Sequence, residues 1–145
     1  MDFNYKVMSS TNEAYAFSRL IEHYNEHSRL IVAYDIDDTV RPFRSGSCER
    51  VKSVLRAAAK YLNCYFIVYT CNPNIDKIKK FLDDEELPYD SINENAPFAP
   101  SGMNGKLFYN IFLDDKAGLK EATDRLENLI DYIINLQYNE EVPNE

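Results

Sequence analysis

Three short segments of this chain carry oxygen-bearing side chains suited to phosphoryl chemistry. They read DIDDT at 35–39, TCNP at 70–73 and DDK at 114–116. Carboxylates such as Asp35 and Asp114 are hard oxygen ligands, which suit Mg²⁺ better than zinc. A carboxylate can also attack phosphorus, and a hydroxyl can donate a hydrogen bond to a phosphoryl oxygen. The segments therefore predict a Mg²⁺-dependent phosphoryl-transfer site.

An apolar run precedes each of the three segments. These runs are Leu30–Tyr34, Cys64–Tyr69 and Leu107–Leu113, and a shorter one follows Pro88 at Tyr89–Ile92. Short continuous runs rich in β-branched and aromatic residues predict buried strands. Open α/β sheets bind ligands at the carboxyl ends of their strands, so the three polar segments are expected to lie at one edge.

Amphipathic helices are expected between these strands. Apolar spacing predicts helices that begin near Ser10, near Ser47 and at Asn72, and a C-terminal helix over 119–138. Ser and Asn are residue types that cap helix N-termini, whereas Pro and Gly make 93–105 a loop. Strands alternating with helices predict an α/β protein: a three-layer α/β/α, Rossmann-like fold with a small, mostly parallel sheet and helices on both faces.

Several carboxylates at one sheet edge are costly unless a cation lies among them. Two carboxylates 4 Å apart repel by roughly 4 kcal/mol at an effective dielectric constant of 20. A solvated turn or helix cap would explain any single acidic pair equally well. That alternative is weaker for the three strand ends considered together.

The order of these motifs resembles that of the haloacid-dehalogenase-like superfamily over about residues 30–120. An apolar strand ends in a DxDx[TV] motif, the next ends in Ser or Thr, a Lys or Arg follows, and a last strand ends in Asp-Asp. The matching residues are Asp35, Asp37, Thr39, Thr70, Lys106, Asp114 and Asp115. The Gly-Lys shortly before the last strand makes the chain similar to small phage and bacterial members.

The resemblance implies a role for every matched residue except Thr39. Asp35 would be the nucleophile that forms an aspartyl-phosphate, and Asp37 would protonate the leaving group and then activate water. Thr70 would donate a hydrogen bond to the phosphate, and Lys106 would neutralise its charge. Four residues would hold Mg²⁺: Asp35 and Asp114 through carboxylates, Asp37 through its carbonyl, and Asp115 directly or through water.

Other polar residues near the motifs are weaker candidates. Asp38 fits a local cap or orienting group. Lys77, Lys79, Lys80 and Lys116 are alternatives to Lys106, which also fits a solvated lysine. Candidate substrate contacts are Arg41, Arg44, Asn72 and Asn93, although surface, cap and turn roles explain them equally well. His23 and His27 lie far from the motifs in sequence and are expected to face solvent.

Chain length and composition limit the remaining interpretations. The 145 residues suit one domain, with an N-terminal extension and helix at 1–28, the motifs in 30–120 and the final helix at 119–138. Three cysteines without a CxxC pair predict reduced thiols and a cytoplasmic protein. No apolar run is long enough to span a membrane, and no signal peptide is expected. The net charge of −8 disfavours broad contact with nucleic acid, so a polynucleotide is expected only as a substrate end.

The gaps between motifs predict that no cap domain covers the site. The segments 40–47 and 71–105 are too short, or already used by predicted elements, to hold one. The chain thus resembles the capless branch of the superfamily. Open sites of that kind suit a phosphate at the end of a large molecule, or a lid borrowed from a partner subunit in an oligomer.

The leading hypothesis is a Mg²⁺-dependent phosphomonoesterase that acts on a phosphorylated substrate. A receiver-type signalling module gathers similar residues, but its acceptor Asp ends a middle strand, where this chain has Thr70. A binding module that keeps the fold without turnover is a third interpretation. A phosphatase acting on polynucleotide ends is a narrower form of the first.

Overall fold

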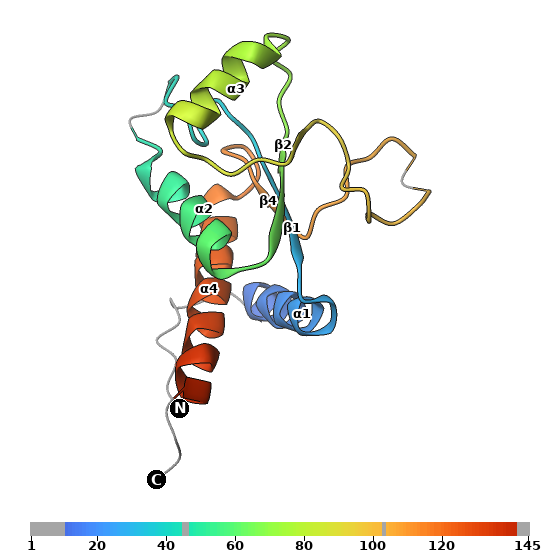
Figure 1. Cartoon of the computed structure of the whole chain (residues 1–145), viewed down its shortest axis with the longest axis vertical. Coiled ribbons are helices and arrows are strands. Elements are labelled where there is room, and N and C mark those ends of the chain that lie inside the picture. The colour runs from blue at the N-terminus through green and yellow to red at the C-terminus, as the bar shows by residue number, and fades with distance from the viewer. Residues whose placement is uncertain (1–10, 45–46, 103, 142–145) are drawn as a thin grey trace.

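A computed structural model describes residues 11–44, 47–102 and 104–141 (Figure 1). These residues form an α/β protein with one sheet of four parallel strands and four helices. The strands are β1 (Leu30–Tyr34), β2 (Cys64–Val68), β3 (Ser91–Ile92) and β4 (Ile111–Leu113), in the order β3-β2-β1-β4. The predicted fold class is thereby confirmed, and the described residues include no cap domain.

The central strand β1 has the bounds that its apolar run predicts. All five of its residues are buried, and Ala33 pairs with Ile67 on β2 and with Phe112 on β4. The other strands are shorter than expected: β2 ends at Val68, β3 has two residues, and β4 begins at Ile111 rather than Leu107.

Asn110 explains the late start of β4. Its backbone N–H donates to the Ile31 carbonyl at 2.8 Å, but its side-chain Oδ1 accepts from the Ile31 N–H at 2.7 Å. A side-chain oxygen thus replaces a backbone carbonyl in the ladder. Phe108, two residues earlier, donates its N–H to Asn95 Oδ1 instead of to β1.

The four helices are α1 (Thr11–His27), α2 (Glu49–Tyr61), α3 (Ile75–Asp84) and α4 (Leu119–Glu141). Two predicted caps are wrong. Asn74 rather than Asn72 caps α3, because its side chain accepts from the Lys77 N–H. Cys48 occupies the N-cap of α2, although the Ser47 hydroxyl just before it accepts from the Glu49 N–H at 3.3 Å. The predicted cap at Ser10 lies outside the described residues.

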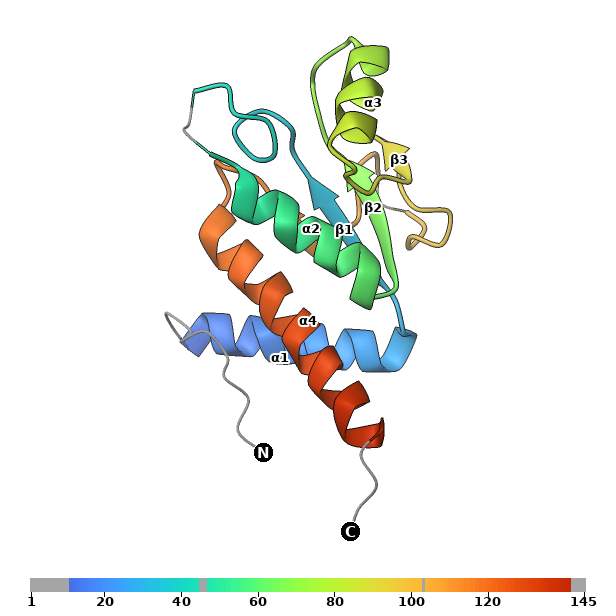
Figure 2. The ribbon, with the colours of Figure 1, turned by 60° about the vertical axis from the view of Figure 1, so that its left-hand side comes forward.

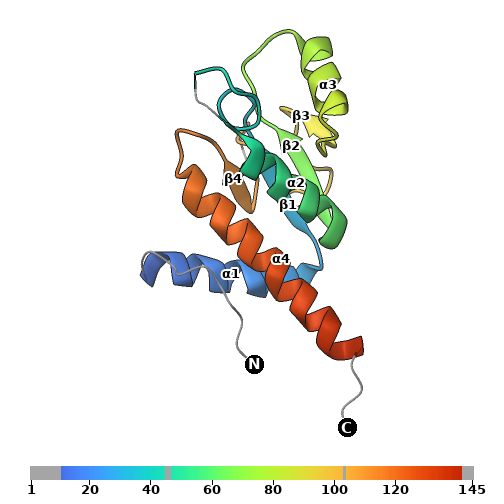
Figure 3. The ribbon, with the colours of Figure 1, turned by 90° about the vertical axis from the view of Figure 1, so that its left-hand side faces the viewer.

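The two faces of the sheet are covered in different ways. Figures 2 and 3 show α2 and α4 packed against each other on one face, with α1 crossing α4. Val32 and Tyr34 of β1 point into that helical core. Ile31 and Ala33 point to the other face, where irregular residues such as Ala96 pack. The buried apolar residues of all four helices belong to the core on the first face, so the expectation of helices on both faces is wrong. The arrangement is still compatible with a small three-layer fold, but within the described residues the second face is covered by a loop.

None of the helices in the described residues has the length and apolar character needed to cross a membrane. The three cysteines are free, with Cys48 buried and Cys71 exposed. Free thiols are what their odd number and spacing predict.

Candidate active site

The acidic segments that follow β1 and β4 meet at the carboxyl edge of the sheet. The ladder continues one residue past the strands, since the Asp35 N–H donates to the Leu113 carbonyl at 2.9 Å. Asp114 and Asp115 follow directly on β4. One carboxylate oxygen from each of Asp35, Asp114 and Asp115 lies within 4.8 Å of the other two. The structure therefore brings together three of the predicted metal ligands.

A tight turn after β1 positions the first motif. The carbonyl of buried Ile36 accepts hydrogen bonds from the N–H groups of residues 39, 40 and 41. Asp38 adopts a left-handed conformation with φ of 60°, and its Oδ1 accepts from the N–H groups of Phe43 and Arg44 at 2.9 and 2.7 Å. Asp38 thus organises the turn, as its predicted local role requires.

The Thr39 hydroxyl lies between the two acidic segments and is completely buried. Its Oγ1 accepts the N–H of Asp115 at 3.1 Å and lies 3.5 Å from both Asp35 Oδ2 and Asp115 Oδ1. Thr39 therefore links the ends of β1 and β4. Sequence reasoning placed it in the motif but missed this positioning role, which only the pairing of β1 with β4 reveals.

Asp35 is the carboxylate whose pKa is most affected by this arrangement. Its pKa is raised to about 6: burial is the largest cause, the hydrogen bond with the Ile36 backbone acts in the opposite direction, and the charges of the neighbouring carboxylates Asp114, Asp115 and Asp37 add to the increase. A cation among these carboxylates would offset both the cost of burying the Asp35 charge and its repulsion by the neighbouring charges. The donor set consists of oxygen atoms alone, and so it fits a hard divalent ion such as Mg²⁺.

The Asp37 carboxylate is paired with Arg41 and is not one of the three that converge. Arg41 donates from Nε and Nη2 to Asp37 Oδ1 at 2.9 and 2.5 Å. Arg41 is thus engaged by Asp37 and not free for a substrate phosphate. Arg44, the other arginine candidate, is exposed and lies over the Phe43 ring at 5.8 Å.

Polar residues after β2 form a network around Thr70. Asn93 holds the Thr70 backbone twice, accepting from its N–H at 2.9 Å and donating to its carbonyl at 2.7 Å. The Thr70 hydroxyl accepts from the Asn72 N–H at 3.1 Å, which leaves the hydroxyl hydrogen for another acceptor. The Asn72 side chain accepts from the Asn74 N–H at 2.9 Å. Asn72 and Asn93 are therefore turn residues in this structure.

A pocket of about 280 Å³ opens on the loop-covered face, near the carboxyl ends of β1 and β4. Its lining residues are Ala33, Tyr69, Asn93, Gly105, Lys106, Leu107, Tyr109 and Phe112. Ala33 and Phe112 lie two residues before Asp35 and Asp114, and side chains two apart on a strand share a face. Lys106 is exposed in this pocket and, within the described part of the chain, forms no ion pair with the carboxylates.

The alternative lysines take other positions. Lys80 pairs with Asp84 at 2.7 Å on α3. The backbone N–H of Lys116 donates to Asp114 Oδ1 at 2.8 Å, which fixes the orientation of that carboxylate. Of the lysine candidates, Lys106 is the one that lines the pocket.

Comparisons of the chain with protein-family models, with curated proteins and with solved structures found no match. The fold and the site thus define the protein as a small α/β protein with a carboxylate cluster at the carboxyl edge of its sheet.

Proposed function

We propose that this protein is a Mg²⁺-dependent phosphohydrolase of the haloacid-dehalogenase-like type, which cleaves phosphomonoesters through an aspartyl-phosphate on Asp35. The convergence of Asp35, Asp114 and Asp115 within 4.8 Å carries this proposal. These three residues would hold the ion, with the Asp37 carbonyl as a further ligand. Bound there, the ion would offset the charge between an anionic nucleophile and an anionic phosphate.

Asp35 carries out the first half of the reaction. A carboxylate oxygen of Asp35 attacks phosphorus, a P–O bond forms, and the bond from phosphorus to the leaving oxygen breaks. Asp37 gives that oxygen a proton, so that an alcohol leaves. Because Arg41 binds Asp37 through Oδ1, the proton would be carried by the other oxygen of that carboxyl group, Oδ2.

Water completes the cycle in the second half. Asp37, now ionised, takes a proton from water as the water oxygen attacks phosphorus. The bond between phosphorus and Asp35 breaks, inorganic phosphate forms, and the Asp35 carboxylate is restored. The Thr70 hydroxyl hydrogen and Lys106 would stabilise the phosphoryl oxygens during both transfers.

The substrate side of the site is open. The pocket that contains Tyr69 and Lys106 begins at Ala33 and Phe112, two residues before Asp35 and Asp114, and exposed Tyr109 forms part of its wall. An organic group attached to the phosphate would lie there. This openness suits a large phosphorylated substrate, of which a polynucleotide end is one narrower candidate.

Hydrolysis of p-nitrophenyl phosphate with and without Mg²⁺ tests the proposal. Asp35→Asn should reduce turnover by at least about a thousandfold, because the amide is a poor nucleophile. Asp76→Asn is a matched control, since Asp76 is an exposed carboxylate on α3, and it should leave turnover unchanged. Turnover that survives in Asp35→Asn would contradict the role of Asp35. Absence of turnover by the unmodified protein on a panel of phosphomonoesters would favour a binding module instead.

A further inference from the structure

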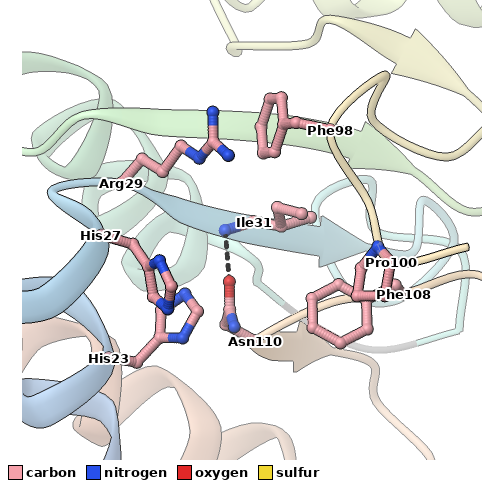
Figure 4. Close-up of a pocket in the computed structure, with 8 residues that line it drawn as sticks. All are labelled: His23, His27, Arg29, Ile31, Phe98, Pro100, Phe108 and Asn110. Carbon is pink, nitrogen blue, oxygen red and sulfur yellow. Dashed lines mark hydrogen bonds between the residues drawn. The ribbon is translucent and has the colours of Figure 1, made fainter.

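A second pocket, of about 250 Å³, lies at the opposite end of β1 from the carboxylates (Figure 4). It forms where α1 leads into β1 and the segment before β4 crosses the same face of the sheet. The lining residues are His23, His27, Arg29, Ile31, Phe98, Pro100, Phe108 and Asn110. The proposed hydrolysis assigns no role to any of them.

One side of this pocket is basic. The rings of His23 and His27 lie 4.5 Å apart, and the Arg29 guanidinium lies 3.6 Å from the centre of the Phe98 ring. His23 is half-buried, so the prediction that it faces solvent is wrong; His27 is exposed as predicted. His23 and His27 are four residues apart on a helix, and this i, i+4 spacing is the sequence signal that predicts the proximity of the two rings.

Among the residues that the structure describes, no carboxylate lines the pocket, although the chain has a net charge of −8. Glu26 lies beside the histidines, with a carboxylate oxygen 3.9 Å from His27 Nε2. This side of the pocket therefore presents positive charge and N–H donors in an otherwise acidic protein.

The other side of the pocket is apolar. Ile31 belongs to the core on the loop-covered face, and Phe108 packs against that core. Figure 4 shows Asn110 between the histidine rings and Phe108, with its Oδ1 turned to the Ile31 N–H. Since Oδ1 already accepts this hydrogen bond, the Nδ2 group of the Asn110 amide supplies N–H donors.

A transition metal fits this pocket less well than an anion. Two histidines four apart on a helix can bind a metal, but Arg29 brings a permanent positive charge to the same space. In the described residues, the two histidines belong to no group of three His, Cys, Asp or Glu ligand atoms that all lie within 4.8 Å of one another. Burial is the main cause that lowers the pKa of His23, and the charges of His27 and Arg29 lower it further, while Glu26 raises it.

We propose that this pocket binds a small organic anion. The charged group, a phosphonate, phosphate or carboxylate, accepts hydrogen bonds from Arg29 and the imidazoles. The apolar body of the ligand packs against Ile31 and Phe108. This site is independent of the proposed hydrolysis.

Histidine NMR tests the proposal directly, because the protein contains only these two histidines. The full-length Asp35→Asn protein, without divalent ions, is titrated with phenylphosphonate, which cannot be hydrolysed at its C–P bond. Both imidazole signals should shift and saturate at millimolar ligand. Uncharged benzyl alcohol should shift neither signal to saturation.

Arg29→Gln should weaken phenylphosphonate binding about tenfold, since one charge-assisted hydrogen bond is lost. Arg19→Gln, an exposed arginine of α1 that lies over Tyr15, is the matched control and should bind as before. Saturation by inorganic phosphate alone with equal affinity would overturn the apolar part of the proposal. Absence of saturable shifts, equal binding by Arg29→Gln, or tighter binding of Zn²⁺ than of the anion would overturn it entirely. If Arg29→Gln fails to fold, His23→Gln with the remaining His27 signal gives the same comparison.

Discussion

The buried Thr39 hydroxyl accepts the backbone N–H of Asp115 at 3.1 Å and thereby joins the turn after β1 to the end of β4. The same oxygen lies 3.5 Å from a carboxylate oxygen of Asp35. One side chain thus sets the spacing between two carboxylates from strands far apart in the sequence. The geometry of the proposed metal site depends on this link.

Thr39→Val removes the link while keeping the shape of the side chain. The Asp115 N–H then lacks its partner, so the free energy of unfolding should fall by about 1–2 kcal/mol. Mg²⁺ should also bind more weakly, because the two acidic segments are no longer held together. Urea unfolding and calorimetric Mg²⁺ titration measure the two effects. Thr39→Ser should restore both, and unchanged Mg²⁺ affinity in Thr39→Val would refute the positioning role.

Asp37→Asn separates proton transfer from nucleophilic attack. An alkyl phosphate needs its leaving oxygen protonated, whereas p-nitrophenolate leaves readily without a proton. The variant should therefore hydrolyse an alkyl phosphate about 10²–10⁴-fold more slowly. With p-nitrophenyl phosphate the rate should fall much less, when it is measured under single-turnover conditions that isolate the first transfer. Equal losses on both substrates would show that Asp37 is not the general acid.

Mg²⁺ affinity should depend on pH through Asp35. In the metal-free protein, burial and neighbouring charges raise the pKa of Asp35 to about 6. Protons compete with the ion below that pH, so apparent affinity should fall by up to about tenfold per pH unit as pH decreases and level off above it. Asp114→Asn removes one repelling charge and should move the midpoint to lower pH. Titration calorimetry from acidic to neutral pH measures this profile, and a flat profile would contradict it.

The fold follows from apolar patterning where tertiary structure does not interfere. The run LIVAY specifies β1 to the residue because every one of its side chains is buried. The start of β4 was missed because the Asn110 side chain takes a place in the ladder, which no propensity encodes. The cap of α3 was predicted at Asn72, but Asn72 accepts the Asn74 N–H in the turn before the helix, and Asn74 accepts the Lys77 N–H as the cap.

The carboxylate cluster was predictable from one topological rule. Parallel strands place their carboxyl ends at one edge, and that rule brings Asp35 beside Asp114 and Asp115. The pairing of Arg41 with Asp37 was not predictable, since it depends on a turn whose path Asp38 sets. The basic pocket was missed because its walls come from α1 and from a loop without periodicity.

Calorimetric titration of the metal-free protein with Mg²⁺ at neutral pH tests the central claim most directly. The account predicts one ion per chain, with affinity reduced by about tenfold or more in Asp114→Asn and unchanged in the exposed-site control Asp76→Asn. No heat of binding at millimolar Mg²⁺, or equal affinity in the unmodified protein and Asp114→Asn, would contradict it.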